Sequence, residues 1–329
     1  MPFGELQDVG QRVSAKRMKR ITQYIHAPVM LDEVIAAFDG VPAGTIVDAT
    51  LGGGGHAGAL LDRREDLRVL GIDRDDAAHD AVAPLIVRFG TRLAVERGRF
   101  DHIPEFLSRH ELTEISGALF DLGVSSPQLD CAERGFSYRE AGPLDMRMDR
   151  SQERTADDVV NRYDEGQIEA LLRAHADERH ARRIARAIVS ARPIRDTAHL
   201  ADVVVAAIPA PARRTGGHPA KRTFQAVRIE VNGELDALPV ALRQAIDATV
   251  LGGRIAVLSY HSGEDRLVAD AFADADRASP PDASPFVHPA SVRSRVRRVR
   301  APRRPSPVEL ERNPRASAAK LRVVEKVGR

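Results

Sequence analysis

Short apolar segments alternate with helix-forming segments from about residue 24 to about residue 128, and this alternation limits the possible folds most strongly. Strands that alternate with helices predict βαβ units and a parallel sheet. The apolar segments are nearly continuous, as expected when helices cover both faces of a sheet. The helix expected at 75–89 contains Pro84, which predicts a bend or interruption there. The predicted strands are TIVDAT (45–50), LRVLGID (67–73), LAVERG (93–98) and ISGALFDLG (115–123).

The alternation stops after the fourth predicted strand. Residues from about 130 to 233 are charged and helix-prone, with no parallel strand evident. A helix at 234–250 and a strand at 252–260 then resume the pattern, and 318–327 predicts a final edge strand. We therefore predict an α/β fold in two domains. Its parts are a sheet domain formed by 25–129 and 234–329 and an inserted helical domain at 130–233.

Composition narrows the class of protein further. Cys131 is the single cysteine, which excludes an internal disulfide framework and a cysteine-based zinc site. The basic N-terminus lacks the apolar region of a secretory signal, and the apolar runs are strand-sized. We expect a cytoplasmic protein with no membrane segment, a mobile basic extension at 1–24 and an irregular segment at 274–310.

Four consecutive glycines follow the first predicted strand, in VDATLGGGGHAGALL (47–61). Bare backbone lets a ligand approach, and the following helix presents free N–H groups at its N-terminus. The second strand ends in Asp73, about 20 residues past the loop, where an acid suits two ribose hydroxyls. A tight turn with a helix-capping aspartate is the structural alternative. The combination at this spacing favours a nucleoside-containing cofactor.

The loop alone does not separate NAD from S-adenosylmethionine. Gly53, Gly55 and Gly58 fit the dinucleotide-binding spacing only loosely. His56, directly after the glycines, fits poorly beside a pyrophosphate, whereas S-adenosylmethionine has no phosphate and needs polar groups around its amino-acid end. His56 either serves that end or is a surface histidine on the first helical turn.

The fourth predicted strand ends in FDLGVSSPQLD (120–130), where a substrate meets the cofactor in a doubly wound sheet. Asp121 is a candidate acceptor of a hydrogen bond from an exocyclic amine or from the cofactor. Ser125, Ser126 and Pro127 form a stiff, polar loop beside it. An ordinary turn is the structural alternative.

Several longer motifs carry a family resemblance. The sequence resembles the RsmH/MraW family, bacterial cytosine-N4 methyltransferases of small-subunit ribosomal RNA, from about residue 26 to the C-terminus. The motifs are HAPVMLDEV (26–34), DATLGGGGH (48–56), GIDRD (71–75), FDLGVSSPQLD, RGFSY, GPLDMRMD (142–149), RTFQAVRIEVN (222–232), SYHSGEDR (259–266) and NPRAS (313–317).

The resemblance implies a class I S-adenosylmethionine-dependent methyltransferase sheet, Rossmann-like, with an inserted helical domain. It implies S-adenosylmethionine as methyl donor, no metal, and 16S ribosomal RNA near the decoding centre of an assembled small subunit as substrate. Tyr260 and Gly263 replace the usual phenylalanine and leucine of the family, and neither is expected to touch the cofactor contacts. The implied cofactor contacts are Gly54, Gly55, His56, Asp73, Phe100, Asp121 and Gln128.

A base must leave its stack or lie in a single strand to reach such a pocket. Asp121, or a backbone carbonyl of the Ser125–Pro127 loop, is the candidate acceptor for the proton of the cytosine amine. Arg222 and Arg228 flank TFQAV and cannot both be buried without partners. The predicted RNA contacts are Ser125, Ser126, Pro127, Arg147, Arg222, Arg228 and His261, and the aromatics for the base or for the core are Phe136, Tyr138, Phe224 and Tyr260.

Two basic segments suit a polyanion. ERHARRIARAIVSAR is expected to place Arg179, Arg183 and Arg186 on one helical face. SVRSRVRRVRAPRRP carries seven arginines and no acid, so its like charges repel unless a polyanion is present. A solvated helix with internal ion pairs is the alternative for the first segment.

Three rival functions remain on the residues alone. An NAD-dependent dehydrogenase explains the glycines and Asp73, but not the helical insertion or the arginine run. A noncatalytic RNA-binding assembly factor with a vestigial cofactor site is the second. A methyltransferase acting on DNA or protein is the third, and only the family resemblance favours ribosomal RNA over it.

Overall fold

The protein is described here from a computed structural model covering residues 28–214, 217–277 and 294–328. Its chain divides into two compact units, Met1–Gly123 with Ala237–Arg329, and Val124–Asp236. The predicted insertion at 130–233 lies within the second unit. The predicted extension at 1–24 lies outside the described residues. No helix of the described residues is long and apolar enough to cross a membrane.

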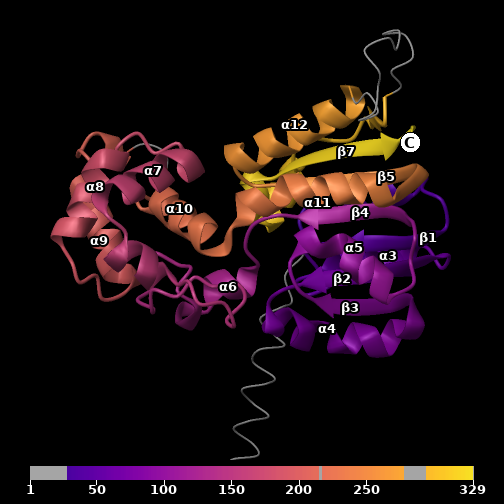
Figure 1. The fold of residues 1–329 in the computed structure, drawn as a ribbon, viewed down its shortest axis with the longest axis horizontal. Coiled ribbons are helices and arrows are strands. Elements are labelled where there is room, and N and C mark those ends of the chain that lie inside the picture. The colour runs from indigo at the N-terminus through magenta and orange to yellow at the C-terminus, as the bar shows by residue number, and fades with distance from the viewer. Residues whose placement is uncertain (1–27, 215–216, 278–293, 329) are drawn as a thin grey trace, which may run out of the picture. The chain divides into compact units, whose positions relative to one another are not determined.

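The first unit is built on a seven-stranded sheet of order β3-β2-β1-β4-β5-β7-β6 (Figure 1). Neighbouring strands from β3 to β5 are parallel, whereas β7 runs antiparallel to both β5 and β6. The expected α/β class is confirmed. The strands are β1 (Gly44–Asp48), β2 (Leu67–Asp73), β3 (Leu93–Arg97), β4 (Ile115–Asp121), β5 (Thr249–Ser259), β6 (Val296–Arg298) and β7 (Lys320–Lys326).

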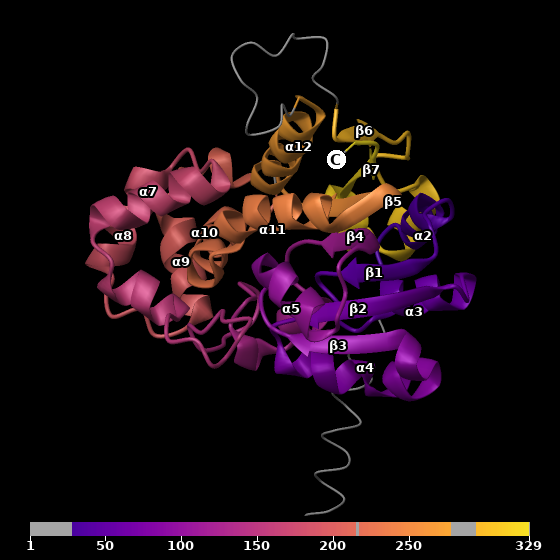
Figure 2. The same ribbon diagram turned by 45° about the vertical axis from the view of Figure 1, so that its right-hand side comes forward.

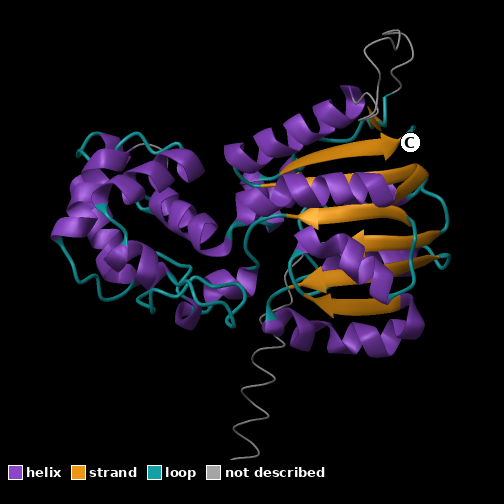
Figure 3. Cartoon of the chain, in the orientation of Figure 1, coloured by secondary structure: helices purple, strands orange, loops and turns teal. Residues whose placement is uncertain are grey.

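Helices cover both faces of this sheet, which explains its nearly continuous apolar strands. Successive residues alternate between two cores: Ile46 packs with α2, α3 and α4, and Val47 packs with α5, α11 and α12. Figure 2 shows α5 and α11 over the strands, with α11 running along them, and Figure 3, coloured by secondary structure, shows helices over the strands in the orientation of Figure 1. The helices of this unit are α2 (Leu31–Phe38), α3 (Gly55–Arg63), α4 (Asp76–Phe89), α5 (Ile103–Arg109), α11 (Glu234–Ala248), α12 (Ser262–Arg277) and α13 (Pro307–Arg312).

Three local expectations differ from the structure. The final strand is not an edge strand, because β7 pairs with β5 on one side and β6 on the other. The segment 274–310 is not wholly irregular, since it holds the end of α12, the short strand β6 and α13, while 278–293 lies outside the described residues. Helix α4 is not interrupted at Pro84 but continues through it as one helix.

The second unit has a separate core. Its described residues form helices and loops around apolar side chains such as Leu172, Ile184 and Leu200, each fully buried. Burial of these side chains is the main stabilising term for such a unit. Its helices are α6 (Ser126–Asp130), α7 (Glu165–Ala176), α8 (Ala181–Ser190), α9 (Thr197–Ala207) and α10 (Lys221–Asn232).

Candidate active site

Three carboxylates gather at one edge of the sheet. Strands β1, β2 and β4 are neighbours and parallel, and they end at Asp48, Asp73 and Asp121. Burial, together with repulsion from Asp121 and Asp73, raises the pKa of Asp48 to about 7. Asp48 was not predicted from the sequence as a site residue. It could have been, because like Asp73 and Asp121 it is an aspartate that ends an apolar strand. The described residues contain no group of His, Cys, Asp and Glu arranged to hold a metal ion.

The raised pKa of Asp48 gives a testable pH dependence. The folded protein holds this proton up to about pH 7, whereas the unfolded chain releases it near 3.8. The resulting stabilisation, on the order of 4 kcal/mol, is present below pH 3.8 and is lost as the pH rises through 7. Asp48→Asn should therefore gain stability relative to wild type between about pH 5 and pH 8. Denaturant unfolding of the cofactor-free proteins measures this, and a stability difference independent of pH would contradict it.

The glycine loop links β1 to α3 and reaches toward β2. Gly52 donates its backbone N–H to Asp73 Oδ2 at 2.8 Å. Gly54 has φ of 74° at the start of α3, and a Cβ there would lie 2.6 Å from Leu85 Cδ1. A Cβ on Gly55 would lie 2.4 Å from Pro28 Cγ. The left-handed backbone at Gly54 and the close contact with Pro28 at Gly55 therefore favour glycine, whether or not a ligand approaches them.

Asp73 is held rigidly at the end of β2. Its Oδ2 accepts from Gly52 N, and its Oδ1 accepts from Asp75 N at 2.8 Å. Burial raises the pKa of Asp73, and the two N–H donors oppose that rise. Each carboxylate oxygen keeps a further lone pair, so the group can also accept from two ribose hydroxyls.

His56 lies in the first turn of α3 and is only 6% exposed, so the surface alternative is wrong. Its Nε2 lies 3.0 Å from the carbonyl oxygen of Val29. Because a carbonyl only accepts, Nε2 carries a proton in this contact. Asp121 Oδ2 lies 3.7 Å from His56 Nδ1, which is too long for a hydrogen bond. His56 and Asp121 therefore lie side by side at the edge of the sheet, where the glycine loop enters α3 and β4 ends.

Asp121 is fixed from two further directions. Tyr260 donates its hydroxyl to Asp121 Oδ1 at 2.6 Å, and the Asp121 amide donates to Thr50 Oγ1 at 2.6 Å. Burial and the neighbouring carboxylate raise the pKa of Tyr260 well above its ordinary value, which keeps the hydroxyl protonated. The expectation that Tyr260 does not touch the predicted cofactor contacts is wrong, because its hydroxyl donates to Asp121, which is one of those predicted contacts.

Phe100 follows β3 in a short helical turn, Phe100–His102. Its ring is half-buried and lies edge-to-face against Phe120, with centroids 6.0 Å apart. Phe120 is fully buried in β4, immediately before Asp121. An aromatic after β3 is thus held at the same edge of the sheet as the three carboxylates.

Gln128 and the predicted serine–proline loop belong to the second unit. Gln128 is 5% exposed, and its Oε1 accepts from the Ser125 amide at 2.9 Å, as a capping residue does. Ser125, Ser126 and Pro127 are half-buried at the start of α6. The carbonyls of Ser125 and Pro127 already accept backbone N–H groups, so they are weaker candidates than Asp121 for accepting a further proton.

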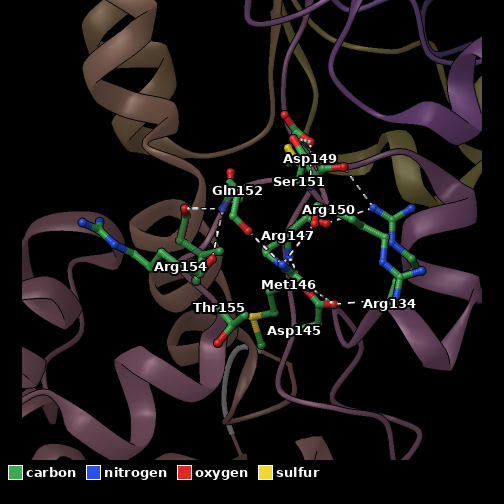
Figure 4. A network of polar contacts seen from close by, with 12 residues as sticks. Arg134, Asp145, Met146, Arg147, Asp149, Arg150, Ser151, Gln152, Arg154 and Thr155 are labelled. Carbon is green, nitrogen blue, oxygen red and sulfur yellow. Dashed lines mark hydrogen bonds and ion pairs between the residues drawn. The ribbon is translucent and has the colours of Figure 1, made fainter.

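The Arg147 side chain forms its hydrogen bonds within its own loop (Figure 4). Its guanidinium binds both carboxylate oxygens of Asp145, at 2.7 and 3.1 Å, and donates to the carbonyls of Arg150 and Gln152. Arg134 supports the same loop by donating to the Arg147 carbonyl at 2.9 Å. Sequence analysis predicted an RNA contact for Arg147; the structure gives its side chain a role in shaping the loop, and that prediction stays untested.

The two arginines of α10 have different surroundings, and neither is buried without a partner. Arg228 forms a two-pronged ion pair with Glu234, at 2.8 and 2.9 Å, and its side chain is 13% exposed. Arg222 is exposed, and its Nη1 lies 3.4 Å from the carbonyl oxygen of Asp177, which is a long contact. Arg222 is therefore the one of this pair whose charge faces solvent.

The remaining candidates are buried or half-buried. Phe136 and Phe224 are buried, 5% and 4% exposed, so both belong to the core. Tyr138 is half-buried and stacks on His218 with centroids 4.4 Å apart. His261 in the first unit lies 3.1 Å from Glu264 Oε1 through its Nε2, and its side chain is only 10% exposed.

The basic segments are more fully paired than expected. Arg179 precedes α8 rather than lying in it, and Arg186 lies 3.6 Å from Glu165. In the arginine run, Arg295, Arg297 and Arg303 pair with Asp247, Glu325 and Asp265. The inference that this run needs a polyanion to offset its own repulsion is therefore weakened, because acids distant in the sequence supply part of the countercharge.

Comparison with known proteins identifies related sequences over almost the whole chain. The model of the family described as "MraW methylase family" matches residues 23–327. Proteins named "Ribosomal RNA small subunit methyltransferase H" are similar to this chain. The one from Mycobacterium sp. (strain KMS) is 47% identical over 311 residues, covering 92% of this chain and 84% of the relative. Those from Nocardioides sp. (strain ATCC BAA-499 / JS614) and Thermobifida fusca (strain YX) are 47% and 45% identical, covering 92% of this chain and 97% and 93% of the relatives.

Proposed function

The chain belongs to the MraW methylase family, and on this premise we propose that it transfers a methyl group from S-adenosylmethionine to small-subunit ribosomal RNA. The acceptor is the exocyclic N4 amine of a cytidine in 16S RNA near the decoding centre, on the assembled subunit. Family membership excludes the dehydrogenase alternative. The names of the relatives support the RNA substrate, and the family resemblance supports the N4 position.

One observation carries the cofactor assignment. His56 Nδ1 and Asp121 Oδ2 lie 3.7 Å apart at the edge of the sheet where the glycine loop enters α3 and β4 ends. A carboxylate binds a cationic amine, and the α-ammonium of S-adenosylmethionine is such a group. Asp73, on the neighbouring side of β1, would then accept from the ribose, and Phe100 would lie near the adenine.

The protein's part in methyl transfer is mainly positioning. When bound, S-adenosylmethionine supplies a methyl group already activated by its sulfonium charge. The lone pair of the cytosine amine is delocalised into the ring, so an acceptor near its hydrogens favours attack and takes the proton late. Asp121 is our candidate for that acceptor, since it ends β4 at the edge where substrates meet cofactors in doubly wound sheets. The geometry must hold the amine about 3 Å from the methyl carbon.

Transfer of label to RNA tests this function. Small subunits that lack the modification would be incubated with the protein and methyl-labelled S-adenosylmethionine, beside free 16S RNA. We expect label in the RNA of the subunits and less in free RNA. Label only in ribosomal proteins, or none in either substrate, would overturn the proposal.

RNA binding by this chain should weaken steeply as salt rises, because contacts to phosphates release counterions. Arg222→Ala should lower the slope of log affinity against log salt by about 1. Arg173→Ala is the matched control, because Arg173 is also exposed in the second unit but is bound to Glu169 at 2.7 Å. Filter binding or fluorescence titration at several salt concentrations measures both variants. A flat salt dependence in the wild type would count against RNA as substrate.

A further inference from the structure

One carboxylate of the first unit receives three cations. Asp265, in the first turn of α12, accepts from Arg303 Nη2 at 3.1 Å, from Lys320 Nζ at 3.0 Å and from Arg322 Nε at 2.7 Å. A single negative charge therefore lies among three positive charges, and two positive charges remain in excess.

The described part of the chain does not offset this excess. Among its residues, no second carboxylate forms an ion pair with Arg303, Lys320 or Arg322. Each of these cations gives Asp265 one nitrogen and keeps further N–H groups. The Arg303 side chain is 55% exposed, and those of Lys320 and Arg322 are 28% and 20% exposed. The three side chains thus present both charge and hydrogen-bond donors to solvent.

The backbone fixes where these cations lie. Lys320 and Arg322 are two residues apart in β7, so their side chains project from the same face of the sheet. The Leu321 amide between them donates to the carbonyl of Arg303 at 3.0 Å, which holds Arg303 beside β7. The cations are therefore positioned before any ligand binds.

The three cations lie near the edge of the sheet that carries the candidate active site. Lys320 begins β7 and pairs with Ser259, the last residue of β5. Strand β5 lies between β7 and β4, and β4 ends at Asp121. Because neighbouring strands are about 4.8 Å apart, the start of β7 lies about 10 Å across the sheet from the end of β4.

We propose that Arg303, Lys320 and Arg322 form a phosphate-binding surface, which holds the backbone of the substrate RNA beside the target nucleotide. Phosphates are bound by charge together with several N–H donors, and the three side chains supply both. A base that leaves its stack to enter the site brings its backbone to this edge of the sheet. This inference rests on the proposed function and names the surface of the first unit that the RNA contacts.

Arg303→Ala tests the inference, because Arg303 is the most exposed of the three and is not among the predicted cofactor contacts. Filter binding to protein-free 16S RNA and to unmodified small subunits would be measured at several salt concentrations. We expect affinity for both to fall about 5-fold, and the slope of log affinity against log salt to fall by about 1. Arg303→Lys keeps the charge and should retain the slope. Affinity for S-adenosylhomocysteine, measured by calorimetry, should stay within about twofold of wild type in both variants.

Arg88→Ala is the matched control. Arg88 is also in the first unit and its side chain is 59% exposed, but it forms its ion pair with a single acid, Asp62, at 2.8 Å. This variant should bind RNA as the wild type does. The comparison separates loss of charge at the proposed surface from loss of any exposed arginine.

Each contrary outcome has its own meaning. Unchanged RNA affinity in Arg303→Ala, or an equal loss in Arg88→Ala, would overturn the inference. Weakening for small subunits but not for protein-free RNA would also overturn it, because the partner would then be an acidic ribosomal protein. Wild-type protein that transfers no methyl group to RNA would overturn the proposed function, whereas the binding measurements would still decide the inference.

Discussion

Replacement of Asp121 with alanine is expected to lower kcat/KM for methyl transfer by about 10²- to 10³-fold, the range found when a preorganised group at a reacting centre is removed. The variant loses Oδ2, which faces His56 Nδ1, and also the candidate acceptor for the proton of the target amine. Affinity for S-adenosylhomocysteine should fall as well, by about 10-fold or more. Steady-state kinetics on unmodified small subunits and calorimetric titration measure the two effects separately.

Asp121→Asn is the informative companion to this variant. It keeps the size of the side chain and an acceptor for Tyr260, but it removes the negative charge. If charge is what the site requires, the asparagine variant should be nearly as impaired as the alanine variant. Activity close to wild type with normal cofactor affinity would contradict both roles assigned to Asp121.

Asp73→Ala should weaken S-adenosylhomocysteine binding by about 100-fold, since hydrogen bonds to a charged group contribute roughly 1.5–3 kcal/mol. The substitution removes the proposed ribose acceptor, and it also releases the Gly52 and Asp75 amides that shape the loop. Calorimetric titration measures the change in affinity directly.

Asp76→Ala provides the control for that prediction. Asp76 begins α4 three positions further on and forms an exposed ion pair with Arg97 at 2.9 Å. Exposed pairs of this kind contribute little, so this variant should bind the ligand within about twofold of wild type. Equal weakening in the two variants would show that Asp73 has no special part in binding.

Much of the fold follows from the sequence because the signal is local and repeated. Consecutive apolar residues such as Ile46 and Val47 indicate a strand that is buried on both faces, and the two side chains do lie in different cores. The strands predicted at 67–73 and 115–123 match β2 and β4 closely. Short elements escaped prediction. Strand β6 is Val296–Arg298, and its arginine-rich sequence gives no alternation to detect, because its pairing with β7 depends on distant residues.

Site residues could be predicted from the sequence where a polar side chain directly ends an apolar strand. Asp73 and Asp121 each end an apolar strand, and parallel pairing brings them to the same edge. Contacts made across the chain were not predictable in this way. The Tyr260 hydrogen bond to Asp121 and the packing of Gly54 against Leu85 depend on how separate elements meet.

The ion pairs of the arginines also could not be predicted from the sequence. A run without acids suggests unbalanced charge, but Arg297 and Arg303 meet Glu325 and Asp265 in the folded chain. Asp265 also accepts from Lys320 and Arg322, at 3.0 and 2.7 Å, and these partners lower its pKa to about 2. Charge patterns along the sequence therefore indicate which residues carry charge, whereas the fold decides which of them remain available to RNA.

Identification of the methylated nucleoside tests the central claim most directly. Small subunits lacking the modification would be treated with the protein and isotopically labelled S-adenosylmethionine, and their RNA digested to nucleosides and separated by chromatography with mass detection. The account predicts label in N4-methylcytidine from 16S RNA, and its loss with Asp121→Ala. Label in a different nucleoside, or in ribosomal protein alone, would contradict it.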